Sequence, residues 1–269
     1  MALPLSVQLY SVRDYCEKDF VAVLKRIAAM GYKGVEPAGF WNIRPREFRK
    51  ILDDLGLKIY SSHSPWCGRW NMGESMDIAE SLGLDTLVCG YRPDDFADLD
   101  AIKRTADTTN AMVEVAKRNG FTLFQHNHFW EFERLDGRLK YEIYRELCPG
   151  VKYEIDCFWS TNKGVEDAVA NLKTVLDDTI LLHMKDGVCR QAAKNDGMKN
   201  GLLDMKVDLL PLGEGDLPIK DLVAAANTAP AGQIKTVVVE LDYCEVEMYE
   251  ALERSYRFMT GNGLAEGNK

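Results

Sequence analysis

The sequence predicts an α/β protein in which alternating strands and helices close into one (β/α)8 barrel. Three observations lead to this fold class. Short β-type runs alternate with longer segments of helical period, and eight such units follow one another at an average spacing of ~30 residues, the size of a βα repeat. The length of 269 residues also suits one barrel of this kind. An open, doubly wound sheet is the alternative that the same alternation allows.

Eight runs rich in apolar and β-branched residues predict the strands. They are Leu5–Leu9, Gly34–Glu36, Lys58–Ser61, Thr86–Cys89, Thr122–Gln125, Lys152–Ile155, Ile180–His183 and Thr236–Glu240. No Pro-, Gly- or Ser-rich stretch divides these units, so we expect residues 1–269 to form a single domain.

Apolar residues at helical spacing, together with the residues that stop them, predict the helices. Asp19–Met30 stops before Gly31, and Pro45–Leu55 has proline in its first turn and stops before Gly56. The remaining helical segments are Met76–Leu82, Leu99–Arg118, Tyr141–Leu147, Val165–Leu172, Ile219–Asn227 and Glu247–Met259. The long irregular stretch Gly187–Leu217 follows the seventh strand, and a polar segment of that length is usually a functional loop or a lid.

Charge and cysteine content limit the class of protein. The net charge is -9, with 33 basic and 42 acidic residues and no basic stripe, so we expect no nucleic-acid partner. The seven cysteines are scattered without a CxxC spacing, as in proteins that keep reduced thiols. The N-terminus lacks a basic leader, and no run approaches the ~20 apolar residues of a membrane span. We therefore expect a cytoplasmic protein that binds a small polar molecule and no membrane.

All four histidines of the chain end or closely follow a predicted strand. These residues are His63, His126, His128 and His183. In a (β/α)8 barrel the strand C-termini and the loops after them build the active site. Imidazole titrates near neutrality and ligates metals. A single such histidine is more often a hydrogen-bonded core or surface residue, but four at one mouth indicate a site.

Three carboxylates repeat this pattern, because Glu36, Asp156 and Glu240 end the second, sixth and eighth strands. A carboxylate is costly to bury unless it is paired, protonated or bound to a metal. The alternative is a solvated strand tip or a partner for Lys185. Asp156, His183 and Glu240 come from neighbouring strands and could converge on one ion. Mixed carboxylate and imidazole ligands favour Mn²⁺, Zn²⁺, Co²⁺ or Fe²⁺ over Mg²⁺ and Ca²⁺.

Aromatic residues also follow the strands, since Trp41, Trp66 and Trp159 come after the second, third and sixth. They could form an apolar platform for a sugar or an aglycone, although an aromatic near a strand end is more often simple packing.

A Gly-rich segment, LGEGDLP at residues 212–218, precedes a predicted helix. A phosphate could bind at such a helix N-terminus. Because Glu214 and Asp216 lie within the segment, we interpret it as a tight turn.

Eight segments resemble, in order, those of the xylose isomerase-like TIM barrels, the group of sugar phosphate isomerases and epimerases with inosose dehydratase-like members. The segments are SVQLYSVRD, GVEPAGF, SSHSP, QHNHFWEF, EIDCFW, HMKDG, LGEGDLP and VVVELD. The resemblance runs from Leu5 to Glu240 and the closing helix. The ordered set is specific for the superfamily and much less so for the substrate.

The resemblance implies one divalent metal ion, Mn²⁺ first with Zn²⁺, Co²⁺ or Fe²⁺ as alternatives, held by a Glu, Asp, His, Glu set from strands five to eight. Asp156, His183 and Glu240 match the last three positions. Many relatives have Glu followed by Asn-His where this chain has His126-Asn127-His128. Aligning Asn-His puts His126 in the place of the glutamate. His126 is therefore either the fourth ligand or a catalytic residue beside a three-ligand site.

The implied function is a divalent-metal-dependent sugar or polyol isomerase or epimerase that abstracts a proton next to a carbonyl through a metal-stabilised enediolate. The candidate groups for proton transfer are Glu240, His63, His128 and Lys185. The candidate substrate-binding residues are Glu36, Trp66 and Trp159. The family's epimerases use two metal-bound glutamates as acid and base. Because one of them is replaced in this chain, the resemblance favours isomerisation, dehydration or elimination over epimerisation.

Several alternatives stay open. A lyase could act on a keto-inositol or a 3-keto-glycoside by β-elimination, and a non-catalytic barrel could be the sugar-binding subunit of a larger complex. An endonuclease-IV-like enzyme would need more histidines and a basic rim. A metal-free barrel would leave the histidines to carry acid–base chemistry. Since relatives often form dimers or tetramers, a homo-oligomer is also expected.

Overall fold

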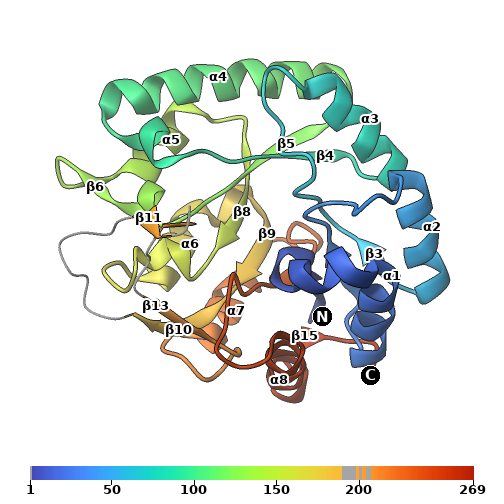
Figure 1. Ribbon diagram of the computed structural model, residues 1–269. Helices are drawn as coiled ribbons and strands as arrows, with labels where there is room; N and C mark the ends of the chain where they lie inside the picture. The colour runs from blue at the N-terminus through green and yellow to red at the C-terminus, as the bar shows by residue number, and fades with distance from the viewer. Residues whose placement is uncertain (1, 190–197, 200–201, 204–206) are drawn as a thin grey trace.

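A sheet of eight parallel strands, surrounded by helices, forms the centre of the molecule (Figure 1). The computed structural model describes residues 2–189, 198–199, 202–203 and 207–269. The strands run in the order β3-β2-β1-β14-β9-β8-β5-β4. Their bounds are β1 (Leu3–Gln8), β2 (Gly34–Glu36), β3 (Lys58–Ile59), β4 (Thr86–Cys89), β5 (Thr122–His126), β8 (Lys152–Asp156), β9 (Thr179–Met184) and β14 (Val237–Val239). The predicted (β/α)8 class is confirmed, and each predicted strand is present to within two residues at either end.

The sheet curls without a ladder between its two terminal strands. Among the described residues, β3 pairs only with β2 and β4 only with β5. The segment after β3 bridges the remaining space, because the backbone N–H of Cys67 donates to the carbonyl of Val88 in β4 at 2.8 Å. We call this place the β3–β4 seam.

The helices lie outside the strands, each between two of them in sequence (Figure 1). They are α1 (Arg13–Met30), α2 (Pro45–Leu55), α3 (Met72–Leu82), α4 (Leu99–Arg118), α5 (Lys140–Leu147), α6 (Ala168–Val175), α7 (Ile219–Ala226) and α8 (Met248–Gly261). Helix α1 starts before the predicted Asp19, but it breaks there at φ -156° and ψ 90°. The Asp19 carboxylate accepts the N–H of Ala22, so a second helix begins where the sequence predicted it.

The prediction for α6 was wrong by three residues. It begins at Ala168 rather than Val165, because the carboxylate of Asp167 accepts the N–H groups of Val169 and Ala170 and so caps the first turn.

Short elements complete the fold. They are the 3₁₀ turns η1 (Leu9–Val12), η2 (Pro93–Phe96), η3 (Trp130–Phe132), η4 (Trp159–Thr161) and η5 (Leu176–Asp178), and the strands β6 (Arg134–Leu135), β7 (Arg138–Leu139), β10 (Asp186–Cys189), β11 (Met198–Lys199), β12 (Leu202–Leu203), β13 (Val207–Leu210) and β15 (Ala265–Glu266). Strand β15 pairs with the start of β1, which brings the two ends of the chain together (Figure 1).

The stretch Gly187–Leu217 is more regular than expected. Its two ends form an antiparallel pair, β10 with β13, in which Gly187 lies opposite Leu209. Residues 190–197, 200–201 and 204–206 lie outside the described residues, and the expectation of a lid falls on them.

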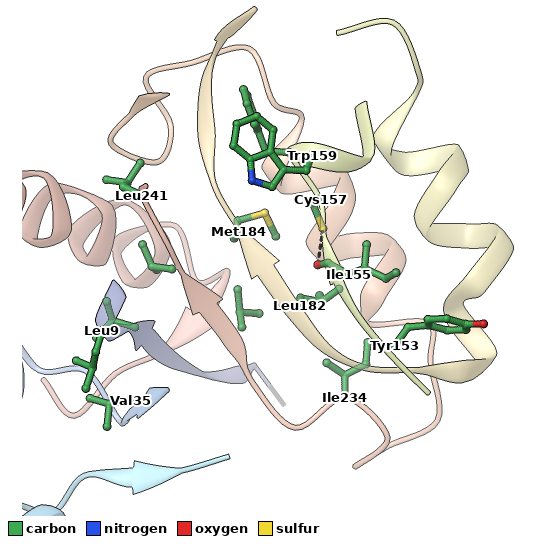
Figure 2. Close-up of a cluster of buried hydrophobic side chains, with 14 of the residues drawn as sticks. Leu9, Val35, Tyr153, Ile155, Cys157, Trp159, Leu182, Met184, Ile234 and Leu241 are labelled. Carbon is green, nitrogen blue, oxygen red and sulfur yellow. Dashed lines mark hydrogen bonds between the residues drawn. The ribbon is translucent and has the colours of Figure 1, made fainter. Parts of the chain in front are cut away.

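Side chains alternate between the two faces of each strand, so the core has an outer part between strands and helices and an inner part inside the barrel. Side chains such as Ile155, Leu182 and Met184 pack toward the helices (Figure 2). The opposite side chains face the barrel interior, where Phe124 and Leu181 belong to a small separate apolar cluster. Because the period of a strand is two residues, the next inward positions fall at the strand C-termini, and these positions are polar.

Among the described residues, no helix is both long and apolar enough to cross a membrane.

Candidate active site

Four strand-end residues predicted as metal ligands meet at one point. His126 ends β5, Asp156 ends β8, His183 lies in β9, and Glu240 directly follows β14. One possible ligand atom from each lies within 4.8 Å of those of the other three, and all four side chains are buried. The structure therefore brings together the four residues that the sequence suggested as ligands.

Lys185 lies among the carboxylates of this set. Its Nζ is 2.8 Å from Asp156 Oδ2, 2.8 Å from Glu240 Oε2 and 3.0 Å from Asp242 Oδ2. Burial alone would lower the pKa of Lys185, but the charges of these three carboxylates outweigh it and raise the pKa well above the ordinary value. The carboxylates thus hold Lys185 as an ammonium ion, so their oxygens are arranged to receive positive charge.

A second polar layer lies against the first and contains a residue that sequence reasoning missed. Glu154 Oε2 is 2.6 Å from His63 Nε2 and 3.1 Å from His126 Nδ1, and Oε1 is 3.3 Å from His183 Nε2. Glu154 is fully buried. The signal was available, because Glu154 precedes Asp156 by two residues in one strand and must share its face.

Glu36 belongs to the same layer. Its Oε2 is 2.7 Å from His183 Nε2 and also accepts a hydrogen bond from the side-chain amide of Gln8. We call Glu36, His63, His126, Glu154 and His183 the carboxylate–histidine layer.

Burial and charge set the protonation states of this layer. Burial alone would raise the pKa of Glu154, but the charges of His183 and His63 hold it well below the ordinary value. Burial would lower the pKa of His183, but Glu154, Glu36 and Glu240 raise it well above 6.5. Burial lowers the pKa of His126 to about 3. His126 is therefore neutral, and because Nδ1 faces Glu154, its Nε2 carries the free lone pair.

A cavity of about 780 Å³ opens above the site at the barrel mouth. The predicted residues that line it are His63, Trp66, His126, His128, Trp159, Lys185 and Glu240. Glu36 does not line it, because this side chain is only 1% exposed and is held by Gln8 and His183. Glu36 thus lies where it can orient His183. It does not contact the cavity in which we expected it to bind the substrate.

The aromatic residues differ in their surroundings. Trp159 is buried, with the Lys185 ammonium 5.1 Å from its ring centroid. The ring of Trp41 instead packs 4.7 Å from Phe20, outside the residues that line the cavity. Only Trp66 and Trp159 of the three suggested tryptophans therefore reach the site.

The segment 212–218 is a turn, as interpreted from its acidic residues. The carboxylate of Asp186 accepts the N–H groups of Gly213, Gly215 and Leu217. A Cβ at Gly215 would lie 2.3 Å from Asp186 Oδ1, so only glycine fits there. The anion at these amides is the protein's own carboxylate.

The comparisons with known proteins agree with this architecture. A family model described as a xylose isomerase-like TIM barrel matches residues 24–242. No protein of curated function matches the sequence. Among solved structures, a sugar phosphate isomerase/epimerase from Parabacteroides distasonis is similar, with a TM-score of 0.73 and 22% identity over 99% of this chain and 96% of that one.

Two further structures show the range of activities on the same fold. The probable 3-DHS dehydratase AsbF of Bacillus anthracis, involved in petrobactin synthesis, has a TM-score of 0.69 and 12% identity over 96% of this chain and 99% of its own. The D-allulose 3-epimerase from Methylomonas sp., solved with D-allulose, has a TM-score of 0.65 and 11% identity over 97% of both chains. At these identities the likeness shows the fold alone.

Proposed function

The chain belongs to the xylose isomerase-like TIM barrel family, and from that premise we propose that it is a divalent-metal-dependent isomerase or epimerase of a sugar or polyol. The observation that carries the proposal is the convergence of His126, Asp156, His183 and Glu240 beneath a cavity at the strand C-termini. The reaction would move a proton on a carbon next to a carbonyl.

The donor set fits a divalent ion. Two imidazoles and two carboxylates favour Mn²⁺, Zn²⁺, Co²⁺ or Fe²⁺, and we propose Mn²⁺ first. When bound, the ion would act as a Lewis acid toward the carbonyl and the neighbouring hydroxyl oxygen of the substrate. Of the four residues, His126 and Glu240 also line the cavity, whereas Asp156 and His183 lie behind them. Neutral His126 can present its Nε2 lone pair without first losing a proton.

Three side chains of the cavity wall can exchange protons with a substrate. Burial would raise the pKa of Glu240, but Lys185 and His183 hold it well below the ordinary range, so Glu240 is ionised. Burial lowers the pKa of His128 well below 6.5, so His128 is a neutral imidazole. Its Nδ1 is buried and has no hydrogen-bond partner among the described residues. Glu240 and His128 are therefore the bases, and Lys185 holds a proton at Nζ.

A lyase is the second candidate, and one contact favours it. The base Glu240 and the ammonium of Lys185 lie 2.8 Å apart, and both line the cavity. A β-elimination needs a base for the proton next to the carbonyl and an acid for the departing oxygen. Such a pair could serve a keto-inositol or a 3-keto-glycoside.

Elemental analysis of the purified protein tests the metal assignment first. We expect about one equivalent of Mn, Zn, Co or Fe, lost in both Asp156→Ala and Glu240→Ala. Glu131→Gln is the control, because Glu131 is fully buried and bonds to Gln125 and the N–H of His128 but to none of the four residues. A wild-type protein that takes up no metal on supplementation would overturn the proposal.

Turnover of ketoses, inososes and 3-keto-glycosides, with and without a chelator, then separates the reactions. Proton exchange with solvent and a rearranged product support the isomerase, and loss of the leaving group supports the lyase. Full activity after chelation would overturn both. Tight sugar binding that survives Asp156→Asn, without turnover, would indicate a binding subunit instead.

A further inference from the structure

A second cavity lies beside the mouth cavity and shares part of its wall. Its volume is about 870 Å³, and five residues line both cavities. They are Trp66, Arg92, Pro93, His128 and Trp130. We call the second cavity the annex. It lies at the β3–β4 seam, because two of its lining residues come from the two sides of the seam. Cys67 makes the backbone hydrogen bond to Val88 across the seam, and Gly90 follows Val88 by two residues.

Trp66 stands between the two spaces. Its ring centroid is 4.6 Å from that of His63 and 5.9 Å from that of His126, so it covers the carboxylate–histidine layer. A Cβ at Gly90 would lie 2.5 Å from this indole, which shows that the ring lies directly against the backbone. Trp66 is 41% exposed, and its ring forms a wall of both the site and the annex.

Trp70 offers a second aromatic surface in the annex. Its indole is 88% exposed, although one side lies against Gly68, where a Cβ would be 2.8 Å from the ring. A single exposed aromatic residue is ordinary. Here, however, two indoles held on glycine backbone line one cavity next to a catalytic centre. Flat indoles with an exposed face are stacking surfaces for a ring.

The polar groups of the annex favour a neutral, hydroxylated ligand. Arg69, Arg92 and Arg104 line it. Asp94 and Asp95 line it as well and offset most of that positive charge. Guanidinium donors and carboxylate acceptors on the same wall suit the hydroxyl groups of a sugar, which both donate and accept hydrogen bonds, whereas the carboxylates would repel a phosphate.

We propose that the annex binds a second sugar ring, joined to the reacting ring by a glycosidic bond, so that the substrate is a glycoside rather than a free monosaccharide. This inference rests on the proposed function, because it assigns the reacting ring to the mouth cavity. Each cavity alone has the size of a complete small-molecule site. A monosaccharide held at the strand ends would leave the annex empty.

Binding measured by calorimetry on the metal-loaded protein tests the annex. The probes are glucose, phenyl glucoside, maltose, cellobiose and glucose 6-phosphate. We expect at least one disaccharide to bind about tenfold more tightly than glucose, since stacking on an indole adds to the area buried. Trp70→Ala and Gly68→Ala should abolish this advantage. Gly73→Ala is the matched control, because a Cβ there meets nothing within 4 Å.

The outcomes separate the annex from the metal site. An advantage of the disaccharide that disappears in Trp70→Ala and Gly68→Ala but persists in Gly73→Ala supports the proposal. Equal binding of glucose and disaccharides, no binding of any probe, or an advantage unaffected by Trp70→Ala overturns it. A preference for phenyl glucoside alone or for the phosphate also overturns it, in favour of an aryl group or an anion. Metal content measured on the same samples reports separately on the proposed function.

Discussion

Replacing Glu154 by glutamine should weaken metal binding, although Glu154 is not itself one of the four residues of the proposed metal set. Glu154 bonds to His126 at 3.1 Å and approaches His183 at 3.3 Å, and both of these histidines belong to that set. A carboxylate behind a ligating imidazole fixes the tautomer and the orientation of the ring and raises its basicity. Glu154→Gln keeps the shape of the side chain but removes that charge.

The size of the effect follows from the number of imidazoles involved. Loss of one carboxylate behind a ligand typically lowers metal affinity 10- to 100-fold. Here one carboxylate serves two proposed ligands as well as His63, which lies 2.6 Å from it. A glutamine has one acceptor oxygen, so its NH₂ group must face an imidazole N–H or force a change of tautomer. We therefore expect a loss of about 100-fold, or ~2.7 kcal/mol.

Calorimetric titration of the metal-free protein with Mn²⁺ and Zn²⁺ measures this loss directly. The electronic spectrum of the Co²⁺ form adds a second readout, because it responds to a change at the ligating nitrogens and not to a general loss of stability. Glu131→Gln is the matched control, because Glu131 is a fully buried glutamate whose hydrogen bonds, among the described residues, go to the Gln125 side chain and the His128 backbone and not to an imidazole ring.

Two results would refute the reasoning. If Glu154→Gln binds metal within threefold of the wild type, Glu154 does not position the ligands. If Glu154→Gln and Glu131→Gln lose affinity equally, the loss comes from burying a neutral amide in this region and not from the histidine contacts.

Three further predictions concern stability, each measured by urea unfolding. Burial raises the pKa of Glu131 from 4.5 to about 8, so its contribution to the free energy of unfolding is complete below pH 4.5 and is lost as the pH rises through 8. Glu131→Gln should therefore be more stable than the wild type at pH 9, by ~5 kcal/mol at most, and should match it below pH 4.5. Lys185→Met should lower the free energy of unfolding of the metal-free protein by ~3–5 kcal/mol, because three carboxylates lose their shared cation. Equal free energies of unfolding for the variant and the wild type would contradict this. Asp186→Ala should cost ~2–4 kcal/mol through the orphaned amides of the 212–218 turn, with unchanged metal content, and a loss of metal would assign Asp186 to the site.

Hydrophobic periodicity, together with the proline and glycine residues that begin and end helices, made the fold predictable from the sequence. Helix α2 has the same bounds in prediction and structure, because Pro45 starts it and Gly56 adopts the left-handed conformation, at φ 68°, just after it ends. The start of α6 was missed because Asp167, and not the first apolar residue, caps it. The pair β10–β13 was missed because its partners are separated by a long segment, and neighbouring residues carry no signal of such pairing.

The candidate site could be predicted in part, because its place follows from the fold class. Residues at the strand tips, such as Asp156 and Glu240, could be recognised because a barrel has its active site there. Glu154 lies one inward position deeper in β8 and was not considered among the strand-tip residues. Its role depends on three histidines from three other segments, which only the folded chain brings together. The annex likewise depends on how Trp66 and Trp70 lie on glycine backbone.

The β3–β4 seam should also determine where the barrel opens in solution. Strand β3 has two paired residues, all on its β2 side, whereas β8 and β9 share four residue pairs. Local opening follows the weakest hydrogen bonding of a sheet, so amide hydrogens of β3 and of the Trp66–Gly68 segment should exchange with deuterium sooner than those of β8 and β9. A ligand bound in the annex would contact residues on both sides of the seam and should therefore slow that exchange.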